Sequence, residues 1–146
     1  MTILLVDDDE SYRLLLRDML MEEGHDVMLA EDGDQALERL DRVKIDLVIS
    51  DVYMPVMDGF RFHKTVRSNP KFERLPFLFV SAYDDQYTME AVKDPRVEGF
   101  VKKGRPFAEL LEWTEYLTAP DDKRANLIPG SRPGVEGRSE ASTRTP

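Results

Sequence analysis

Two stretches, ILLVDDD at residues 3–9 and LVISD at residues 47–51, decide the fold of this chain. In each stretch, a short apolar run is followed by acidic residues. Three aspartates (residues 7–9) end the first stretch, and Asp51 ends the second. Such runs are typical of buried parallel strands, and open α/β sheets place their ligand sites at the carboxyl ends of these strands. Because carboxylates gathered there repel one another unless a cation joins them, the pattern predicts a hard divalent metal and phosphate chemistry.

Strand and helix patterns alternate five times along the chain. Gly24 stands where a helix C-cap glycine belongs, prolines 70 and 95 end two helices, and Pro106 suits the first turn of the last one. Five such units with short connections predict a flavodoxin-like, doubly wound parallel sheet of five strands in the order 2-1-3-4-5, with five helices. The predicted strands are 3–6, 27–30, 47–50, 77–80 and a short one around 100–101, and the predicted helices are 10–23, 32–40, 60–67, 85–93 and 106–117.

Composition divides the chain at about residue 118. The net charge of −9 is concentrated in residues 1–118, which carry −10, whereas residues 119–146 carry +1 and are dominated by Pro, Gly, Ser, Arg and Thr. We therefore predict one domain over residues 1–118 and a flexible tail or linker over 119–146, because the tail has too few large apolar residues to offset the cost of ordering it.

The same composition excludes several classes of function. An acidic body argues against nucleic-acid binding, which needs a basic surface. No apolar run approaches the ~20 residues that a membrane helix needs, and no secretory signal is evident. With no cysteine in the sequence, disulfides and thiolate metal sites are excluded. We expect a cytoplasmic protein that does not contact a membrane.

The predicted sheet brings five polar side chains to one edge. Asp7 and Asp8 face Asp51 across neighbouring strands, Ser81 ends the fourth strand, and Lys103 follows the fifth. A phosphoryl group on a carboxylate needs this combination of a metal that neutralises charge and donors for the phosphate oxygens.

Four motifs at these strand ends carry a family resemblance: LLVDDD (4–9), SDVYMPVMDG (50–59), VSA (80–82) and GFVKK (99–103). With them, the chain resembles the receiver domain of two-component response regulators, of the kind found in chemotaxis regulators. The resemblance covers about residues 1–118. It implies that Asp51 is the phosphoacceptor, that Asp8, Asp51 and the backbone carbonyl of Tyr53 bind Mg²⁺ (or Mn²⁺), and that Asp7 acts on the metal mainly through water.

The resemblance also assigns the remaining roles. Ser81 and Lys103 would contact the phosphoryl oxygens, and Phe100 would be a switch residue. The phosphoryl donor would be a sensor histidine kinase or a phosphotransfer protein. The fourth helix, fifth strand and fifth helix would form the output surface for a downstream protein or a missing output domain, and a homodimer through that surface is a further expectation. The protein would be a signalling module and not an enzyme.

Two other readings stay open from the sequence. A haloacid-dehalogenase-like phosphatase would use Asp7 as the nucleophile, since Asp7-Asp8-Asp9 contains its Asp-x-Asp spacing, although the small residue and the Thr expected after it are absent. A pseudo-receiver would keep the fold and bind partners without taking phosphate.

The chain departs from the receiver pattern after Lys103. Gly104 and Arg105 stand before Pro106 where the family usually has Lys followed directly by Pro, often through a cis bond. Among the other residues, His25 and His63 are predicted to be exposed or to cap helices, and Asp58-Gly59 to start a helix. Tyr53 and Tyr83 are hypothesised to crowd the water that would attack a phosphoryl group.

Overall fold

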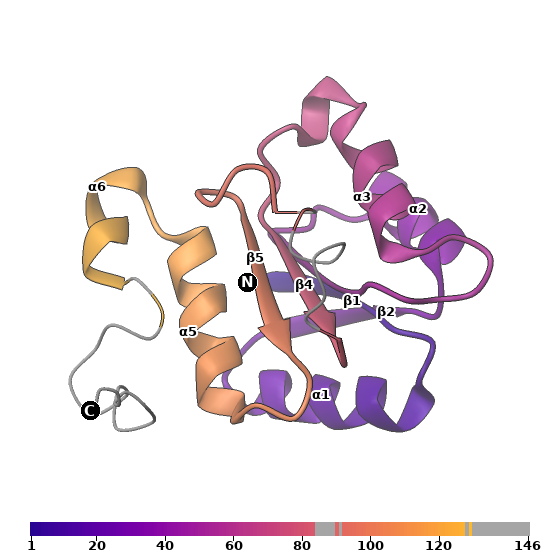
Figure 1. The fold of residues 1–146 in the computed structure, drawn as a ribbon, viewed down its shortest axis with the longest axis horizontal. Helices are drawn as coiled ribbons and strands as arrows, with labels where there is room; N and C mark the ends of the chain where they lie inside the picture. Colours follow the sequence, from indigo (N-terminus) through magenta and orange to yellow (C-terminus); the bar gives the residue numbers. More distant parts are fainter. Residues whose placement is uncertain (84–89, 91, 128, 130–146) are drawn as a thin grey trace.

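The computed structural model of the protein describes residues 1–83, 90, 92–127 and 129. Five parallel strands form one sheet in the order β2-β1-β3-β4-β5 (Figure 1), as the sequence predicts for a flavodoxin-like, doubly wound fold. The elements are β1 (Thr2–Val6), α1 (Glu10–Glu22), β2 (Asp26–Ala30), α2 (Gly33–Arg42), β3 (Leu47–Asp51), α3 (Gly59–Arg67), η1 (Pro70–Phe72), β4 (Phe77–Ser81), β5 (Glu98–Lys102), α5 (Phe107–Thr118), α6 (Asp121–Arg124) and η2 (Ala125–Leu127).

One predicted element cannot be followed in full. The helix predicted over residues 85–93 falls mostly outside the described residues, so it stays a prediction. Glu90, which is described, lies in a turn, and Val92 and Lys93 are not helical. The fifth strand is longer than expected, because Glu98 and Gly99 already pair with β4.

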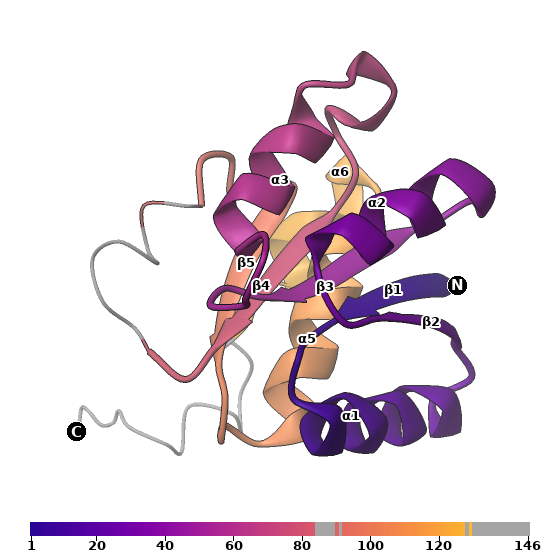
Figure 2. The same cartoon turned by 90° about the vertical axis from the view of Figure 1, so that its right-hand side faces the viewer.

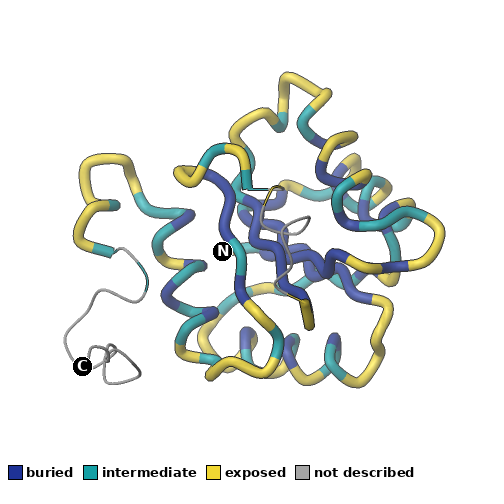
Figure 3. Tube along the Cα trace, in the orientation of Figure 1, coloured by how far each residue is buried: buried dark blue, intermediate teal, exposed yellow. Residues whose placement is uncertain are grey.

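Helices cover both faces of the sheet (Figure 2). Between the sheet and the helices, the apolar residues form two separate cores, one on each face. Because side chains alternate along a strand, Leu4 and Val6 of β1 face α2 and α3, whereas Ile3 and Leu5 face α1 and α5. Four strands, β1, β3, β4 and β5, are therefore buried along most of their length, whereas the edge strand β2 is only partly buried (Figure 3). This double coverage leaves the strand ends as the places where polar side chains reach solvent.

Aspartates placed shortly after strands start three of the helices. Asp9, Asp32 and Asp58 are the N-cap residues of α1, α2 and α3, and their carboxylates accept hydrogen bonds from backbone N–H groups three residues later at 3.2, 2.9 and 2.9 Å. The N–H groups of a first helical turn lack partners within the helix, and these caps satisfy one in each case. The predicted helix start at Asp58-Gly59 is confirmed.

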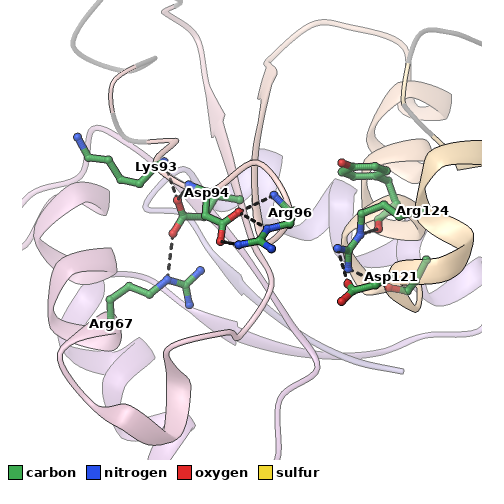
Figure 4. Close-up of polar contacts among 9 residues, drawn as sticks. Arg67, Lys93, Asp94, Arg96, Asp121 and Arg124 are labelled. Atoms are coloured by element: carbon green, nitrogen blue, oxygen red, sulfur yellow. Dashed lines mark hydrogen bonds and ion pairs between the residues drawn. The ribbon is translucent and has the colours of Figure 1, made fainter.

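A buried carboxylate at the start of β5 ties that strand to α3. Glu98 Oε2 lies 2.5 Å from His63 Nε2. The same oxygen accepts a hydrogen bond from Arg67 Nε at 3.0 Å, and Oε1 accepts from the backbone N–H groups of Lys93 and Asp94 at 2.7 and 3.0 Å; Figure 4 labels these three donor residues. Burial alone would raise the pKa of Glu98, but these hydrogen bonds outweigh it and lower the pKa to about 2.

The prediction for His63 was wrong. Its ring is buried against Phe77 and Phe79 of β4, with centroid separations of 4.8 and 5.2 Å, and it bonds Glu98. A histidine on the inner face of α3 needs a polar partner once it is buried, and that partner comes from a strand 35 residues later in the chain.

The chain continues in ordered turns past residue 118. Arg124 donates to the carbonyl oxygens of Tyr116 and Ala119 at 3.2 and 2.9 Å and pairs with Asp121 at 2.8 Å. A cationic donor at the carboxyl end of α5 satisfies carbonyls that the helix leaves free. Composition assigns residues 121–127 to the tail, but in the structure they form α6 and η2. None of the helices in the described part of the chain combines the length and the apolar character that crossing a membrane requires.

We expect Glu98→Gln to lower the free energy of unfolding by about 2 kcal/mol at pH 7, because Arg67 and His63 lose their anionic partner. The folded-state pKa of Glu98 lies below its ordinary value, so this stability is present above about pH 4.5 and is lost as the pH falls toward 2. Urea unfolding of both proteins between pH 7 and pH 3 would measure it. Glu38→Gln, which breaks an exposed pair with Arg39, should change stability little, and a Glu98 effect independent of pH would contradict the assignment.

We expect Gly99→Ala to lower the free energy of unfolding by about 1–3 kcal/mol, because a Cβ atom at residue 99 would lie 2.5 Å from the ring of Trp113. Urea denaturation of Gly99→Ala, Trp113→Leu and the double variant forms a complete cycle. Gly99→Ala should lower the free energy of unfolding much less in the Trp113→Leu protein than in the wild type. An equal decrease in both proteins would mean that the ring of Trp113 is not what the Cβ atom meets.

Candidate functional site

The polar side chains predicted to converge lie at one edge of the sheet. Asp7 directly follows β1, Asp51 is the last residue of β3, Ser81 is the last of β4, and Lys103 directly follows β5. The parallel register places these four strand ends beside one another. The carboxyl edge of the sheet therefore carries two acids, a hydroxyl and an amine from four separate segments.

Three carboxylates at this edge are arranged as a metal site would require. Asp7, Asp8 and Asp51 each offer an oxygen, and these oxygens all lie within 4.8 Å of one another. Asp7 and Asp51 are buried and Asp8 is exposed, so the cluster is rigid on one side and open to solvent on the other. Carboxylate oxygens are the donors that Mg²⁺ and Mn²⁺ prefer, and the residues present fit such an ion.

Backbone groups hold the two buried carboxylates in place. Asp51 Oδ1 accepts a hydrogen bond from the N–H of Val52 at 2.7 Å, and Asp7 Oδ1 accepts from the N–H of Asp9 at 2.9 Å. Arg13 of α1 donates to the carbonyl oxygen of Asp7 at 2.6 Å. With one oxygen of each acid fixed in this way, the Oδ2 oxygens face the interior of the site.

Lys103 bridges those two oxygens. Its Nζ lies 2.8 Å from Asp7 Oδ2 and 3.3 Å from Asp51 Oδ2, and its backbone N–H donates to the carbonyl oxygen of Ser81 at 2.7 Å. Burial works to lower the pKa of Lys103, but the hydrogen bond to Asp7 and the attraction of Asp51 outweigh it, so the pKa is raised. The neighbouring Lys102 is exposed, and it is Lys103 that reaches the acids.

Burial also dominates the chemistry of Asp51. It raises the pKa of Asp51 to about 6; the negative charge of Asp7 acts in the same direction, and Lys103 opposes both. A carboxylate that is partly desolvated and faces a single ammonium group is poorly neutralised, so a further cation would stabilise its ionised form. Such an oxygen is suited to attack an electrophilic phosphorus.

The other residues named from the sequence lie as follows. Ser81 is buried, and its hydroxyl accepts a hydrogen bond from the N–H of Tyr83 at 3.1 Å. Tyr53 and Tyr83 are exposed, and their rings meet edge to face at 5.3 Å, joining the loops after β3 and β4. Phe100 is half-buried and packs against the core on the α2 and α3 face. The roles of the Tyr53 carbonyl and of Phe100 stay predictions.

Sequence reasoning missed three contributors to the site. Arg13 and Tyr12 come from the first turn of α1, and the Lys103 ammonium lies 4.5 Å from the centroid of the Tyr12 ring. Burial is the main cause that raises the pKa of Tyr12, to about 12. Gly59 packs so closely on the carbonyl of Asp51 that a Cβ atom would lie 2.2 Å from that oxygen. The local signal was their position at the start of the helices that follow the two acidic strand ends, α1 and α3.

The insertion after Lys103 forms an open turn. Gly104 has a φ of 91°, in the left-handed region that favours glycine, and Arg105 pairs with Glu109 of α5 at 2.9 Å. The described residues contain no cis peptide bond. Lys103 nevertheless reaches Asp7 and Asp51, so the two extra residues are absorbed by the turn and do not displace the amine.

Comparison with known sequences identifies the family. The profile described as response regulator receiver domain matches residues 3–115. An uncharacterized 14.6 kDa protein in the sodA1 3′ region of Leptolyngbya boryana is 48% identical over 124 residues, covering 84% of this chain and 95% of that protein. The response regulator MprA of Mycobacterium leprae is 37% identical over 125 residues, covering 84% of this chain; the chain spans about half (54%) of MprA.

Comparison with solved structures points to the same family. The chemotaxis protein CheY4 of Vibrio cholerae superposes with a TM-score of 0.74 at 31% identity, covering 80% of this chain and 97% of CheY4. The response regulator TrrA of Thermotoga maritima, solved in complex with Mg²⁺ and BeF, gives a TM-score of 0.70 at 31% identity over the same shares of the two chains. The shared sheet order, the acidic edge and the match over most of the chain lead to one conclusion: this protein belongs to the response regulator receiver domain family.

Proposed function

We propose that this receiver domain takes a phosphoryl group on Asp51 in a Mg²⁺-dependent reaction, for which Mn²⁺ can substitute. The carrying observation is the geometry around Asp51, a buried carboxylate that shares a cluster with Asp7 and Asp8 and lies 3.3 Å from the Lys103 ammonium. The donor would be a sensor histidine kinase or a phosphotransfer protein, in keeping with the response regulators among its relatives.

In the proposed reaction, a carboxylate oxygen of Asp51 attacks phosphorus, the new O–P bond forms, and the P–N bond to the donor histidine breaks with its electron pair returning to the imidazole. Asp8, Asp51 and the Tyr53 carbonyl would hold the metal, with Asp7 acting mainly through water. When bound, the ion neutralises charge on the transferring group. The hydrogen bond from Val52 orients Asp51 throughout.

Lys103 and Ser81 would then stabilise the product. The Lys103 ammonium already lies between Asp7 and Asp51, so a short displacement brings it to a phosphoryl oxygen. The Ser81 hydroxyl accepts the N–H of Tyr83 and keeps its own proton for donation. Charge-assisted bonds of this kind are strong enough to bias a two-state element, and Phe100 would be that element's switch residue.

The output would be a change in protein contacts. We propose that the surface formed by the helix predicted over residues 85–93, β5 and α5 binds a downstream protein or an output domain, and that a homodimer can form through it. Receiver domains of response regulators generally act as signalling modules, and we propose that this one does so in the cytoplasm without contacting nucleic acid or membrane.

Incubation with acetyl phosphate and Mg²⁺ should add one phosphoryl group to the intact protein, as measured by mass spectrometry. Asp51→Asn should abolish the adduct, and removal of Mg²⁺ with a chelator should prevent it. Asp58→Asn is the matched control, because asparagine caps a helix as well as aspartate does and Asp58 caps α3.

An adduct that persists in Asp51→Asn and disappears in Asp7→Asn would replace this proposal with the phosphatase alternative. A wild-type protein that never takes phosphate would be a pseudo-receiver.

Asp8→Asn should weaken divalent-metal binding by about ten-fold or more, because it removes one charged ligand of the cluster. Titration with Mn²⁺, followed by the broadening of amide resonances near residues 7, 8 and 51, would give the dissociation constant. The adjacent Asp9→Asn is the control, since Asp9 caps α1 and lies outside the cluster. Equal weakening by both substitutions would point to general charge and not to ligation.

A further inference from the structure

We infer that Tyr12 is a positioning residue for the phosphoryl-transfer reaction: the face of its ring holds the Lys103 ammonium over Asp7 and Asp51. The inference rests on the proposed function and extends it to a residue on α1. Its basis is one contact, the Lys103 Nζ lying 4.5 Å from the centroid of the Tyr12 ring.

The surroundings of Lys103 make this contact strong. Its ammonium has two carboxylate oxygens at 2.8 and 3.3 Å and the Tyr12 ring at 4.5 Å, and its side chain is only 19% exposed. The attraction between a cation and an aromatic face grows as water is excluded. The carboxylates and the ring therefore act together on the same charge.

Neither the Lys103 side chain itself nor the residue that follows it fixes the position of the ammonium group. A lysine side chain has four flexible carbons, and the next residue, Gly104, has no side chain and nothing within 4 Å of where its Cβ would lie. Tyr12, in contrast, is held on both counts, because its ring packs against the core between α1 and α5 and its backbone N–H donates to the N-cap carboxylate of Asp9 at 3.2 Å. The run of aspartates that supplies the carboxylates thus also caps the helical turn that carries this ring.

An aromatic face suits a cation that must move during the reaction. When Asp51 accepts the phosphoryl group, Lys103 has to exchange a contact with a carboxylate for one with a phosphoryl oxygen. A third carboxylate in place of Tyr12 would hold the ammonium back and add negative charge. The ring attracts the ammonium without net charge and over a range of positions, so it keeps Lys103 over the site while the exchange occurs.

The test compares Tyr12→Leu, which removes the ring, with Tyr12→Phe, which keeps its face. The rate of phosphoryl uptake from acetyl phosphate should fall about five-fold in Tyr12→Leu and stay within about two-fold of wild type in Tyr12→Phe. Leu15→Ala, an exposed change on the same helix, should leave the rate unchanged. In NMR spectra recorded with and without Mg²⁺, the ring should shift the Lys103 side-chain protons upfield in the wild type and in Tyr12→Phe, but not in Tyr12→Leu.

The outcomes separate this inference from the function on which it rests. A wild-type rate in Tyr12→Leu, an equal loss in Tyr12→Phe, or an upfield shift that vanishes when Mg²⁺ is added would overturn the role of Tyr12 while Asp51 still takes phosphate. A wild-type protein without any adduct would instead refute the proposed function, and the reaction role of Tyr12 with it. Retained phosphorylation in Tyr12→Phe, with the predicted loss in Tyr12→Leu, supports both.

Discussion

The structure depends on the repulsion between two buried carboxylates at the carboxyl edge of its sheet. Asp7 and Asp51 are both buried there and close enough to repel each other, and burial raises the pKa of Asp51 to about 6. The ammonium of Lys103 joins their free oxygens. Each of these residues sits at the end of a different strand, so the parallel sheet is what holds the like charges together and brings them their counterion.

The rest of the fold makes that arrangement rigid. Two apolar cores pack against the two faces of the sheet, and burial of these alternating side chains sets the register of the strands. At the opposite end of β5, buried Glu98 ties the strand to α3 through Arg67 and His63. The hydrogen bonds of Glu98 lower its pKa to about 2, whereas the pKa of Asp51 stays raised to about 6 because its burial and the charge of Asp7 outweigh the effect of Lys103.

Much of this could be predicted from the sequence, and the limits have physical causes. Five alternating strand and helix patterns with short connections predicted the strand order. That order in turn predicted the convergence of Asp7, Asp51 and Lys103, because each follows or ends a strand of the same parallel sheet. The buried pair of His63 and Glu98 could not be predicted, since its partners lie 35 residues apart and leave no periodic signal. The folding of residues 121–127 into helical turns was not predicted, for a similar reason. This fold depends on one donor, Arg124, which contacts the carboxyl end of α5. Composition describes a whole segment and does not indicate a single contact of this kind.

The charges of the site give a reason why the proposed phosphoryl group and the proposed metal would occupy it together. Three carboxylates and one ammonium leave the cluster with two excess negative charges. An acyl phosphate on Asp51 would remove the charge of that carboxylate and add about −1.5 to −2 in its place, so the excess would grow toward three. A divalent cation would reduce the excess to about one negative charge, which the proposed hydrogen bonds from Ser81 and Lys103 would stabilise. On this charge balance, the proposed phosphoryl group at Asp51 would depend on the proposed metal site, and the same three aspartates would provide both.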